Sequence, residues 1–188
     1  MKSSREVFDV ATLLFAKFLS GLFIFLPQGL SERIAYLLIR FSFLFLPRFK
    51  KVALRNLSIV FPEKSFLEHL NIYYASLKTL ANNFVCFAKV PTLTLARVNE
   101  LADFSEGEPV IRQAIADGNG KGIVLATAHF GNFEFLTQAL TLRIRPMSIL
   151  ARPFKKLPLF TKWWWLRRET FGNEVFDRLG GFKEIVSR

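Results

Sequence analysis

The first sixty residues contain two long apolar runs. One extends from Val7 to Leu26, is interrupted by the charged Asp9 and Lys17, and stops at Pro27; the other begins at Ile34. The first run approaches the roughly 20 residues of a membrane-spanning helix, but a lysine near the middle of a lone span is unfavourable. A signal peptide would need a small-residue cleavage site, which does not follow the run. A pair of ordinary core helices is the other alternative. Apolar helices flanked by Lys and Arg are typical of a segment that lies in or dips into a membrane face, and we favour this interpretation for residues 1–60.

From residue 61 onward the pattern changes to helices alternating with short apolar strands. Ser65 is predicted to cap a helix that ends before Pro91. The continuous apolar run 123–128 is typical of a buried strand. Strand, helix and strand within about thirty residues form a βαβ unit, which favours a parallel sheet. We therefore predict one α/β domain over residues 61–188, with a mostly parallel sheet flanked by helices. The expected elements are helices at 66–89, 110–116, 132–142 and 155–170 and buried strands at 123–128 and 147–151.

Composition and charge narrow the choice of partner. The chain is 51% hydrophobic, has 22 Phe residues and carries a formal net charge of +11. Residues 1–60 hold nine Lys or Arg against three acids, and residues 151–188 hold nine against four. Two basic ends indicate an anionic partner, for which a membrane is the best fit. Nucleic acid is not expected, because no zinc spacing, RNP-like motif or recognition helix is present. No metal site is predicted.

Four residues could carry chemistry: two of them have simpler interpretations, and the other two stand out by their position. The single cysteine, Cys86, excludes an internal disulfide and is expected to be a small core residue. His69 lies in the charged stretch "EKSFLEHL" and is expected to be a solvated helix residue. The other histidine, His129, follows the predicted strand 123–128, and Glu134 stands five residues after it.

The spacing of His129 and Glu134 predicts a catalytic geometry. On one continuous helix they would point about 140° apart. If His129 ends the strand and Asn132 caps the next helix, Glu134 falls in the first helical turn beside the turn that carries His129. Gly131 allows the sharp turn and a close approach of substrate. A carboxylate bonded to one ring nitrogen raises the basicity of the other, so the pair would form the base–orienter half of a catalytic triad. The nucleophile would then be a hydroxyl of the substrate. A core histidine beside a chance glutamate is the alternative.

The segment "GKGIVLATAHFGNFE" resembles the signature of the bacterial lipid A biosynthesis acyltransferases, the lauroyl/myristoyl transferase family of H-x-x-x-x-E acyltransferases. "RNLSIVFPEKS", from Arg55 to Ser65, and "SILARP", ending at Arg152 and Pro153, are similar to two further segments of the family. Arg168, four residues before Gly172, is similar to an arginine in the family's R-x-x-x-G arrangement. The resemblance implies a glycerolipid-acyltransferase-like fold.

What the resemblance implies about function is transfer of a fatty acyl group to a hydroxyl of a lipid A precursor or similar membrane glycolipid. The donor would be a thioester of acyl carrier protein or coenzyme A, and no cofactor would be needed. His129 would be the general base and Glu134 its orienting partner. Gly131 and Asn132 would line the substrate site, with Arg152 and Arg168 binding substrate phosphates through paired guanidinium donors. The enzyme would work at the cytoplasmic face of the bacterial inner membrane.

Two departures from the family pattern accompany the resemblance. Phe133 stands where the family usually has tryptophan, so an aromatic ring is kept. The family's chains usually continue for roughly a hundred more residues, including a D-Q segment, so residues 61–188 are expected to be the amino-terminal portion of the domain. A truncated, inactive membrane-binding protein is therefore one alternative, and an acyltransferase for a different lipid acceptor is another.

Overall fold

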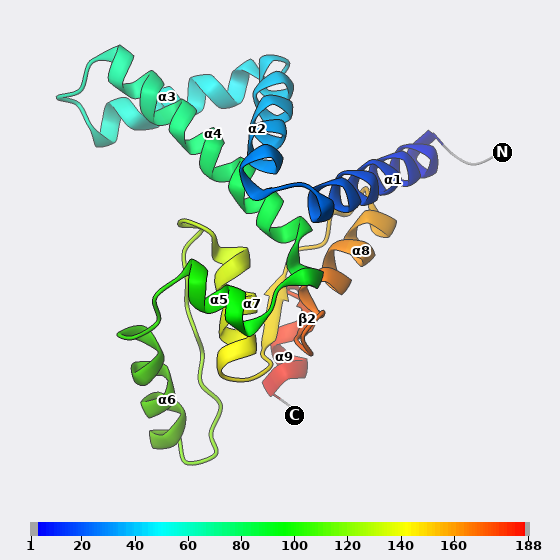
Figure 1. Ribbon diagram of the computed structural model, residues 1–188, viewed down its shortest axis with the longest axis vertical. Helices are drawn as coiled ribbons and strands as arrows, with labels where there is room; N and C mark the ends of the chain where they lie inside the picture. Colours follow the sequence, from blue (N-terminus) through cyan, green and yellow to red (C-terminus); the bar gives the residue numbers. More distant parts are fainter. Residues whose placement is uncertain (1–3, 187–188) are drawn as a thin grey trace.

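Helix α4 is the element on which the amino-terminal helices pack. The computed structural model describes residues 4–186. Within them, α1, α2 and α3 all contact α4, and α4 extends from this layer toward the rest of the protein (Figure 1). The helices of this layer are α1 (Ser4–Phe25), α2 (Gln28–Leu44), α3 (Pro47–Val60) and α4 (Phe66–Ala88).

Local signals explain where these helices begin. Pro27 precedes α2 and Pro47 occupies the first turn of α3, where a missing N–H costs nothing because it would have no partner inside the helix. Ser65 forms a complete capping box with Glu68: its side chain accepts from the Glu68 N–H, and the Glu68 carboxylate accepts from the Ser65 N–H. The predicted helix at 66–89 is thereby confirmed, with its start at the expected residue.

The core of the amino-terminal layer is built from small residues. Ala81, Val85 and Ala88 on α4 meet Phe23 of α1 and Ala35 of α2, and all five are buried. Alanines at a helix crossing let the backbones approach closely, so that few voids remain. Toward α8, α4 presents Phe87 instead, whose ring stacks on that of Trp164 with centroids 4.0 Å apart.

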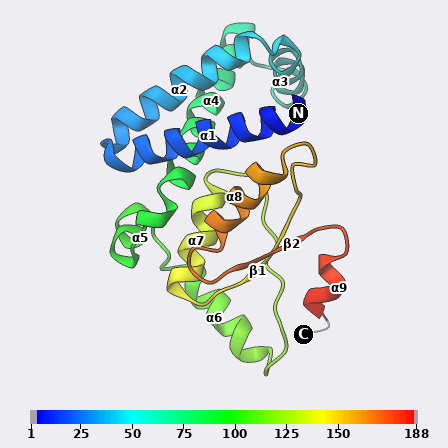
Figure 2. The same cartoon turned by 90° about the vertical axis from the view of Figure 1, so that its right-hand side faces the viewer.

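The second half of the chain contains a helical layer and one small sheet (Figure 2). Strands β1 (Ser148–Ala151) and β2 (Glu174–Asp177) pair in parallel, with Ser148 opposite Glu174 and Ala151 opposite Asp177. The helix between them, α8 (Pro158–Arg168), makes a βαβ unit of these three elements. The remaining elements are η1 (Val90–Thr92), α5 (Leu95–Leu101), α6 (Gly107–Asp117), α7 (Phe133–Arg143) and α9 (Gly181–Val186).

The predicted strand at 123–128 is wrong. This segment is irregular and mostly exposed, and the Val124 side chain is 88% exposed. A strand requires a neighbouring strand to take up its backbone N–H and C=O groups, and within the described chain no strand is hydrogen-bonded to these residues. The expected βαβ unit is consequently displaced by one helix along the sequence. The fold of residues 4–186 is mostly helical with a two-stranded parallel sheet; the parallel pairing agrees with the prediction, but the sheet is smaller than we expected.

His69 also differs from its prediction as a solvated residue. It is buried, and its Nε2 lies 2.9 Å from the carbonyl oxygen of Phe61, at the end of α3. The ring therefore ties the start of α4 to the end of α3. Cys86 is half-buried, donates to the Asn82 side chain and has its pKa raised chiefly by burial, in keeping with a structural thiol.

Candidate active site

His129 ends the irregular segment that leads into α7. The residue is exposed, and its ring lies against that of Phe133, with centroids 4.5 Å apart. No hydrogen bond joins His129 to Glu134 in the part of the chain that the structure describes. The histidine is accordingly accessible from solvent, and its ring is in contact with the Phe133 ring.

The turn after His129 has the features expected from its sequence. Gly131 has φ +58°, a left-handed conformation that residues with a side chain adopt only with strain. A β-carbon there would meet open space, so the backbone angle alone accounts for the glycine. Asn132 caps α7, because its side-chain oxygen accepts from the Phe135 N–H at 3.1 Å. The predicted helix start is confirmed.

Two asparagines of α4 hold this turn from the other side. Asn83 donates from Nδ2 to the Gly131 carbonyl at 2.9 Å. The Asn82 oxygen accepts from the Asn132 amide at 3.2 Å, and the Asn82 amide donates to Glu32 of α2 at 3.0 Å. A chain of hydrogen bonds therefore runs from α2 through α4 to the turn beside His129.

Glu134 lies in the first turn of α7, as predicted, but its partner is Arg168. Both carboxylate oxygens accept from the guanidinium, one from Nε at 3.0 Å and the other from Nη2. The two side chains are 9% and 17% exposed for Glu134 and Arg168, respectively. The Arg168 guanidinium also lies over the Trp164 ring, 5.9 Å from its centroid. This paired geometry is the strong form of the interaction, since it combines two charge-assisted hydrogen bonds.

The backbone of Arg168 is fixed by a second set of polar contacts. Its carbonyl oxygen accepts from the side-chain amides of Gln138 at 3.2 Å and Asn173 at 3.0 Å. Asn173 in turn accepts from the Thr141 hydroxyl at 2.8 Å and from the Met147 N–H at 2.9 Å. Glu134, Gln138 and Thr141 are spaced along one face of α7, so this face orients the end of α8.

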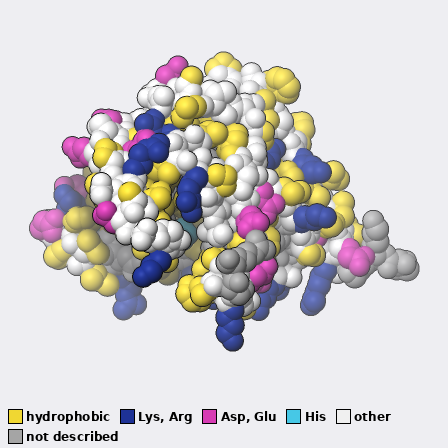
Figure 3. All heavy atoms as spheres, turned by 90° about the horizontal axis from the view of Figure 1, so that it is seen from below, with side chains coloured by type: hydrophobic (Ala, Val, Ile, Leu, Met, Phe, Trp, Pro, Cys, Tyr) yellow, Lys and Arg dark blue, Asp and Glu magenta, His cyan; other side chains and the backbone are white. Residues whose placement is uncertain are grey.

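Arg152 is placed apart from this cluster. It follows β1, is exposed and has no hydrogen bond or ion pair within residues 4–186, and the same is true of Lys155 and Lys156. Figure 3 shows that Lys and Arg side chains on the face opposite α1–α4 are scattered among hydrophobic ones and do not form one patch. The structure thus brings Glu134, Gly131, Asn132 and Arg168 into one connected region, and within residues 4–186 no hydrogen bond or ion pair joins Arg152 to it.

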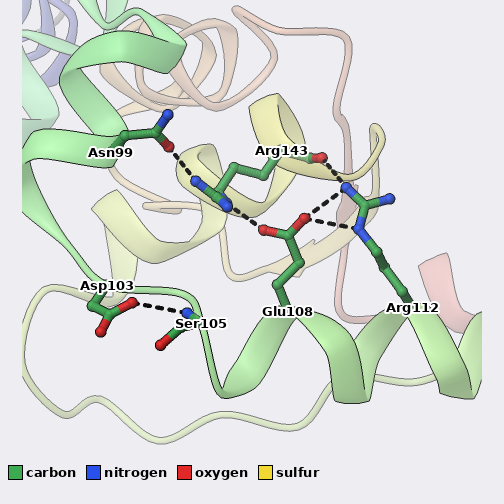
Figure 4. A network of polar contacts seen from close by, with 6 residues as sticks. All are labelled: Asn99, Asp103, Ser105, Glu108, Arg112 and Arg143. Atoms are coloured by element: carbon green, nitrogen blue, oxygen red, sulfur yellow. Dashed lines mark hydrogen bonds and ion pairs between the residues drawn. The ribbon is translucent and has the colours of Figure 1, made fainter.

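An ion-pair network supports the far end of α7 (Figure 4). Arg143 pairs with Glu108 of α6 and donates to the Asn99 side chain of α5, while Arg112 donates to Glu108 at 2.8 Å and to the Arg143 carbonyl at 2.7 Å. The hydrogen bonds from Arg112 and Arg143 lower the pKa of Glu108. Helices α5, α6 and α7 are thereby held together around a crevice.

That crevice is mainly apolar, and its lining includes Thr127, two residues before His129 in the sequence. Its volume is about 420 Å³. Its walls come from the exposed segment at Leu125–Thr127, from one side of α7 and from α5–α6; the larger apolar residues lining it are Phe104, Ile111, Leu125, Phe135, Leu136 and Leu140.

Comparison with known families agrees with the resemblance seen in "GKGIVLATAHFGNFE". The family model described as "Bacterial lipid A biosynthesis acyltransferase" matches residues 3–188. The chain belongs to this family. Its members are acyltransferases, and acyl transfer is the activity that membership assigns to this protein. Neither the curated proteins nor the solved structures include a match to the chain.

Several residues that shape the candidate site were not predicted from the sequence. Asn82 and Asn83 read as polar positions of an amphipathic helix, and no local signal points to their partners 48 and 50 residues away. Arg143 and Glu108 likewise look like ordinary charges on helix surfaces. For Arg168 the family resemblance supplied a signal, but its pairing with Glu134 was not foreseen.

Proposed function

We propose that this protein is an O-acyltransferase that moves a fatty acyl chain from a thioester of acyl carrier protein or coenzyme A to a hydroxyl of a lipid A precursor or similar glycolipid. The proposal rests on an exposed histidine, His129, at the start of a turn that leads into α7. In the first turn of α7, Glu134 is buried and accepts two hydrogen bonds from Arg168. An accessible base beside a fixed charged pair suits a reaction in which the substrate's hydroxyl is the nucleophile.

In the proposed reaction His129 removes the proton of the acceptor hydroxyl. The oxygen attacks the thioester carbonyl, the carbon–sulfur bond breaks, and the thiol leaves with the proton that His129 returns. Glu134 is proposed to orient His129 once substrate is bound, because catalytic hydrogen bonds are often formed only in the loaded enzyme. A turn at Gly131 is the part of the chain that would adjust.

The remaining candidates are assigned to substrate. The apolar crevice that starts at Leu125 offers a place for part of the fatty acyl chain, since its walls are hydrophobic on both sides. Arg168 retains N–H donors that Glu134 does not use, and these suit a phosphate of the glycolipid or of the phosphopantetheine arm. Arg152 is exposed and unpaired among the described residues, so its guanidinium is free to bind the same kind of group, at a position apart from the Glu134–Arg168 pair.

Membrane attachment at the cytoplasmic face of the inner membrane completes the proposal. Of the described helices, α1 is the one long and apolar enough to cross a membrane by length and composition. The excess of basic residues over acids in residues 1–60 favours a surface of anionic lipid.

The decisive experiment compares the two histidines of the full protein in detergent or native membranes. We expect His129→Ala to lower acyl transfer to a lipid A precursor by roughly 10²–10⁴-fold, the usual contribution of a positioned base. His69→Gln is the matched control, because it alters a buried hydrogen bond to Phe61 far from the turn. Retention of near-normal transfer by His129→Ala, with both acyl carrier protein and coenzyme A thioesters as donors, would refute the assignment.

A further inference from the structure

Helix α1 has its exposed apolar side chains and its buried residues on opposite sides. Six large hydrophobic side chains of the helix are strongly exposed: Val7, Phe8, Leu14, Phe15, Phe18 and Phe25. Projected at 100° per residue, they fall within an arc of roughly 120°. We call this set the α1 apolar stripe. The buried residues Asp9, Ser20 and Phe23 lie on the opposite arc.

The side of α1 opposite the stripe is fastened to α8 near the start of both helices. Asp9 is only 2% exposed, and its carboxylate accepts from the backbone N–H groups of Leu159 at 2.8 Å and Phe160 at 3.1 Å. The N-cap residue of α8, Leu157, makes no side-chain hydrogen bond to these N–H groups. Asp9 therefore acts as a capping acceptor for a helix 150 residues away, with its negative charge at the favourable end of the α8 dipole.

A second attachment lies eleven residues further along α1. The guanidinium of Arg167 donates to the Ser20 hydroxyl and to the Ala88 carbonyl, both at 2.8 Å, and Ser20 itself donates to the same carbonyl. Arg167 is enclosed enough that burial lowers its pKa. These contacts join α1, α4 and the end of α8 at one point. These two attachments hold α1 against both ends of α8, and Figures 1 and 2 show the two helices side by side.

A helix held in this way does not have the surface of a membrane span. A lone span is surrounded by lipid on all sides, whereas the strongly exposed large hydrophobic side chains of α1 all lie in the stripe, and the opposite side includes the buried carboxylate of Asp9. Lys17 is exposed beside the stripe, where its ammonium can reach the headgroups. An apolar stripe with a flanking basic residue is the pattern of a helix that lies in the interface.

The charge of the neighbouring helices identifies the occupant of the stripe. Helices α1, α2 and α3 each carry exposed basic residues, and residues 1–60 contain nine Lys or Arg against three acids. We propose that α1 lies in the plane of an anionic bilayer, buried along its apolar stripe and held there by Asp9 and Ser20, and does not cross the membrane. This inference rests on the membrane attachment proposed above and is independent of the catalytic assignment.

The arrangement also links the membrane to the candidate site. Arg167, which holds α1, is followed directly by Arg168, which holds Glu134. A helix fixed in the interface would therefore set the height of the Glu134–Arg168 pair above the lipid, where both an acyl donor in solution and a glycolipid acceptor could reach it.

Depth measurements on the full protein test the proposal. Single cysteines at Val7, Leu14 and Phe25, in a Cys86→Ser background, would carry a probe quenched by lipids labelled at different depths, in vesicles of phosphatidylethanolamine and phosphatidylglycerol. The three positions lie along one line of the helix. We expect similar, shallow depths at all three. If α1 spans, Val7 and Phe25 would lie near the two opposite faces of the bilayer, and the probe at Leu14 would be deeper than the probe at Val7 by about 10 Å, at 1.5 Å per residue.

The outcomes separate this inference from the membrane proposal. A deep probe at Leu14 between shallow probes at Val7 and Phe25 overturns the in-plane helix and leaves membrane attachment standing. No quenching at any position overturns both and assigns the stripe to a protein partner. Asp9→Ala should release the start of α1, so that the Val7 probe changes depth while the Phe25 probe does not. Asp103→Ala, which removes an acceptor for Ser105 remote from α1, is the matched control. Unchanged depths in Asp9→Ala would show that Asp9 does not hold the helix.

Discussion

Replacing Glu134 by glutamine tests whether the Glu134–Arg168 pair is structural as well as functional. The change keeps the shape of the side chain but removes the charge opposite a guanidinium that is 17% exposed. Breaking a fully buried pair from one side typically costs about 3–5 kcal/mol, because the remaining charge is left uncompensated. Since Arg168 keeps some contact with water and glutamine can still accept one hydrogen bond, we expect a loss of about 2–3 kcal/mol.

The assay is thermal unfolding of the purified protein in detergent. For a chain of this size 1 kcal/mol shifts the Tm by about 2–4 °C, so Glu134→Gln should lower it by roughly 5–10 °C. The matched control is Glu100→Gln, which breaks a 2.6 Å ion pair with Arg97 whose side chains are 62% and 49% exposed. Such a solvated pair contributes only about 0–1 kcal/mol.

A double-mutant cycle then isolates the interaction. Removing Arg168 as well, as in Glu134→Gln with Arg168→Leu, eliminates the unpaired charge, so the double variant should lose less than the sum of the two single variants by about 1–3 kcal/mol. Acyl transfer is measured well below both Tm values, so that lost rate is not lost folding. A Tm for Glu134→Gln within about 1 °C of the unaltered protein, or strict additivity in the cycle, would refute the reasoning.

Three further predictions follow from single contacts. Asn83→Ala removes the donor to the Gly131 carbonyl and should lower kcat by about tenfold with little change in KM, as expected for a misplaced turn. Asn71→Ala, at an exposed position of the same helix, is the control. An equal fall of kcat in the two variants would contradict a local role for Asn83. Asp9→Ala should lower the free energy of unfolding by about 1–2 kcal/mol through loss of the α8 cap, measured by denaturant titration, and no change would contradict the cap. Because the pKa of Glu108 is lowered, its ion pairs stabilise the fold above the ordinary glutamate pKa of about 4.3 and this contribution is lost as the pH falls. Between neutral pH and pH ~3 the Tm of Glu108→Gln should therefore fall less than that of the unaltered protein, and equal falls would contradict the assignment.

The helices were largely predictable because the signals that start and stop them are local. The capping box at Ser65 and Glu68 is contained in four residues, as is the cap at Asn132, and the prolines at 27 and 47 act on their own turns. The predicted helix at 155–170 begins instead at Pro158, where a proline suits the first turn. Expectations of this kind need no knowledge of what packs against the helix.

The sheet could not be predicted in the same way. The run 123–128 is as hydrophobic as a buried strand, yet it is exposed, while the strand that pairs with β1 is the modest "EVFD" at 174–177. An apolar run indicates only that burial of these side chains would be favourable. Whether a strand forms depends on backbone partners that come from another part of the chain.

The sequence by itself determined the family, the helix at 66–89, the turn at Gly131 and the position of Glu134 at the start of α7. Only the tertiary structure decided which groups these residues meet. Glu134 binds an arginine 34 residues away, His69 is buried against Phe61, and Asp9 caps a helix 150 residues away. The physical reason is that caps, turns and periodicity are interactions within one or two turns of chain, whereas the partner of a buried charge is whichever opposite charge or dipole the folded chain places within hydrogen-bonding distance.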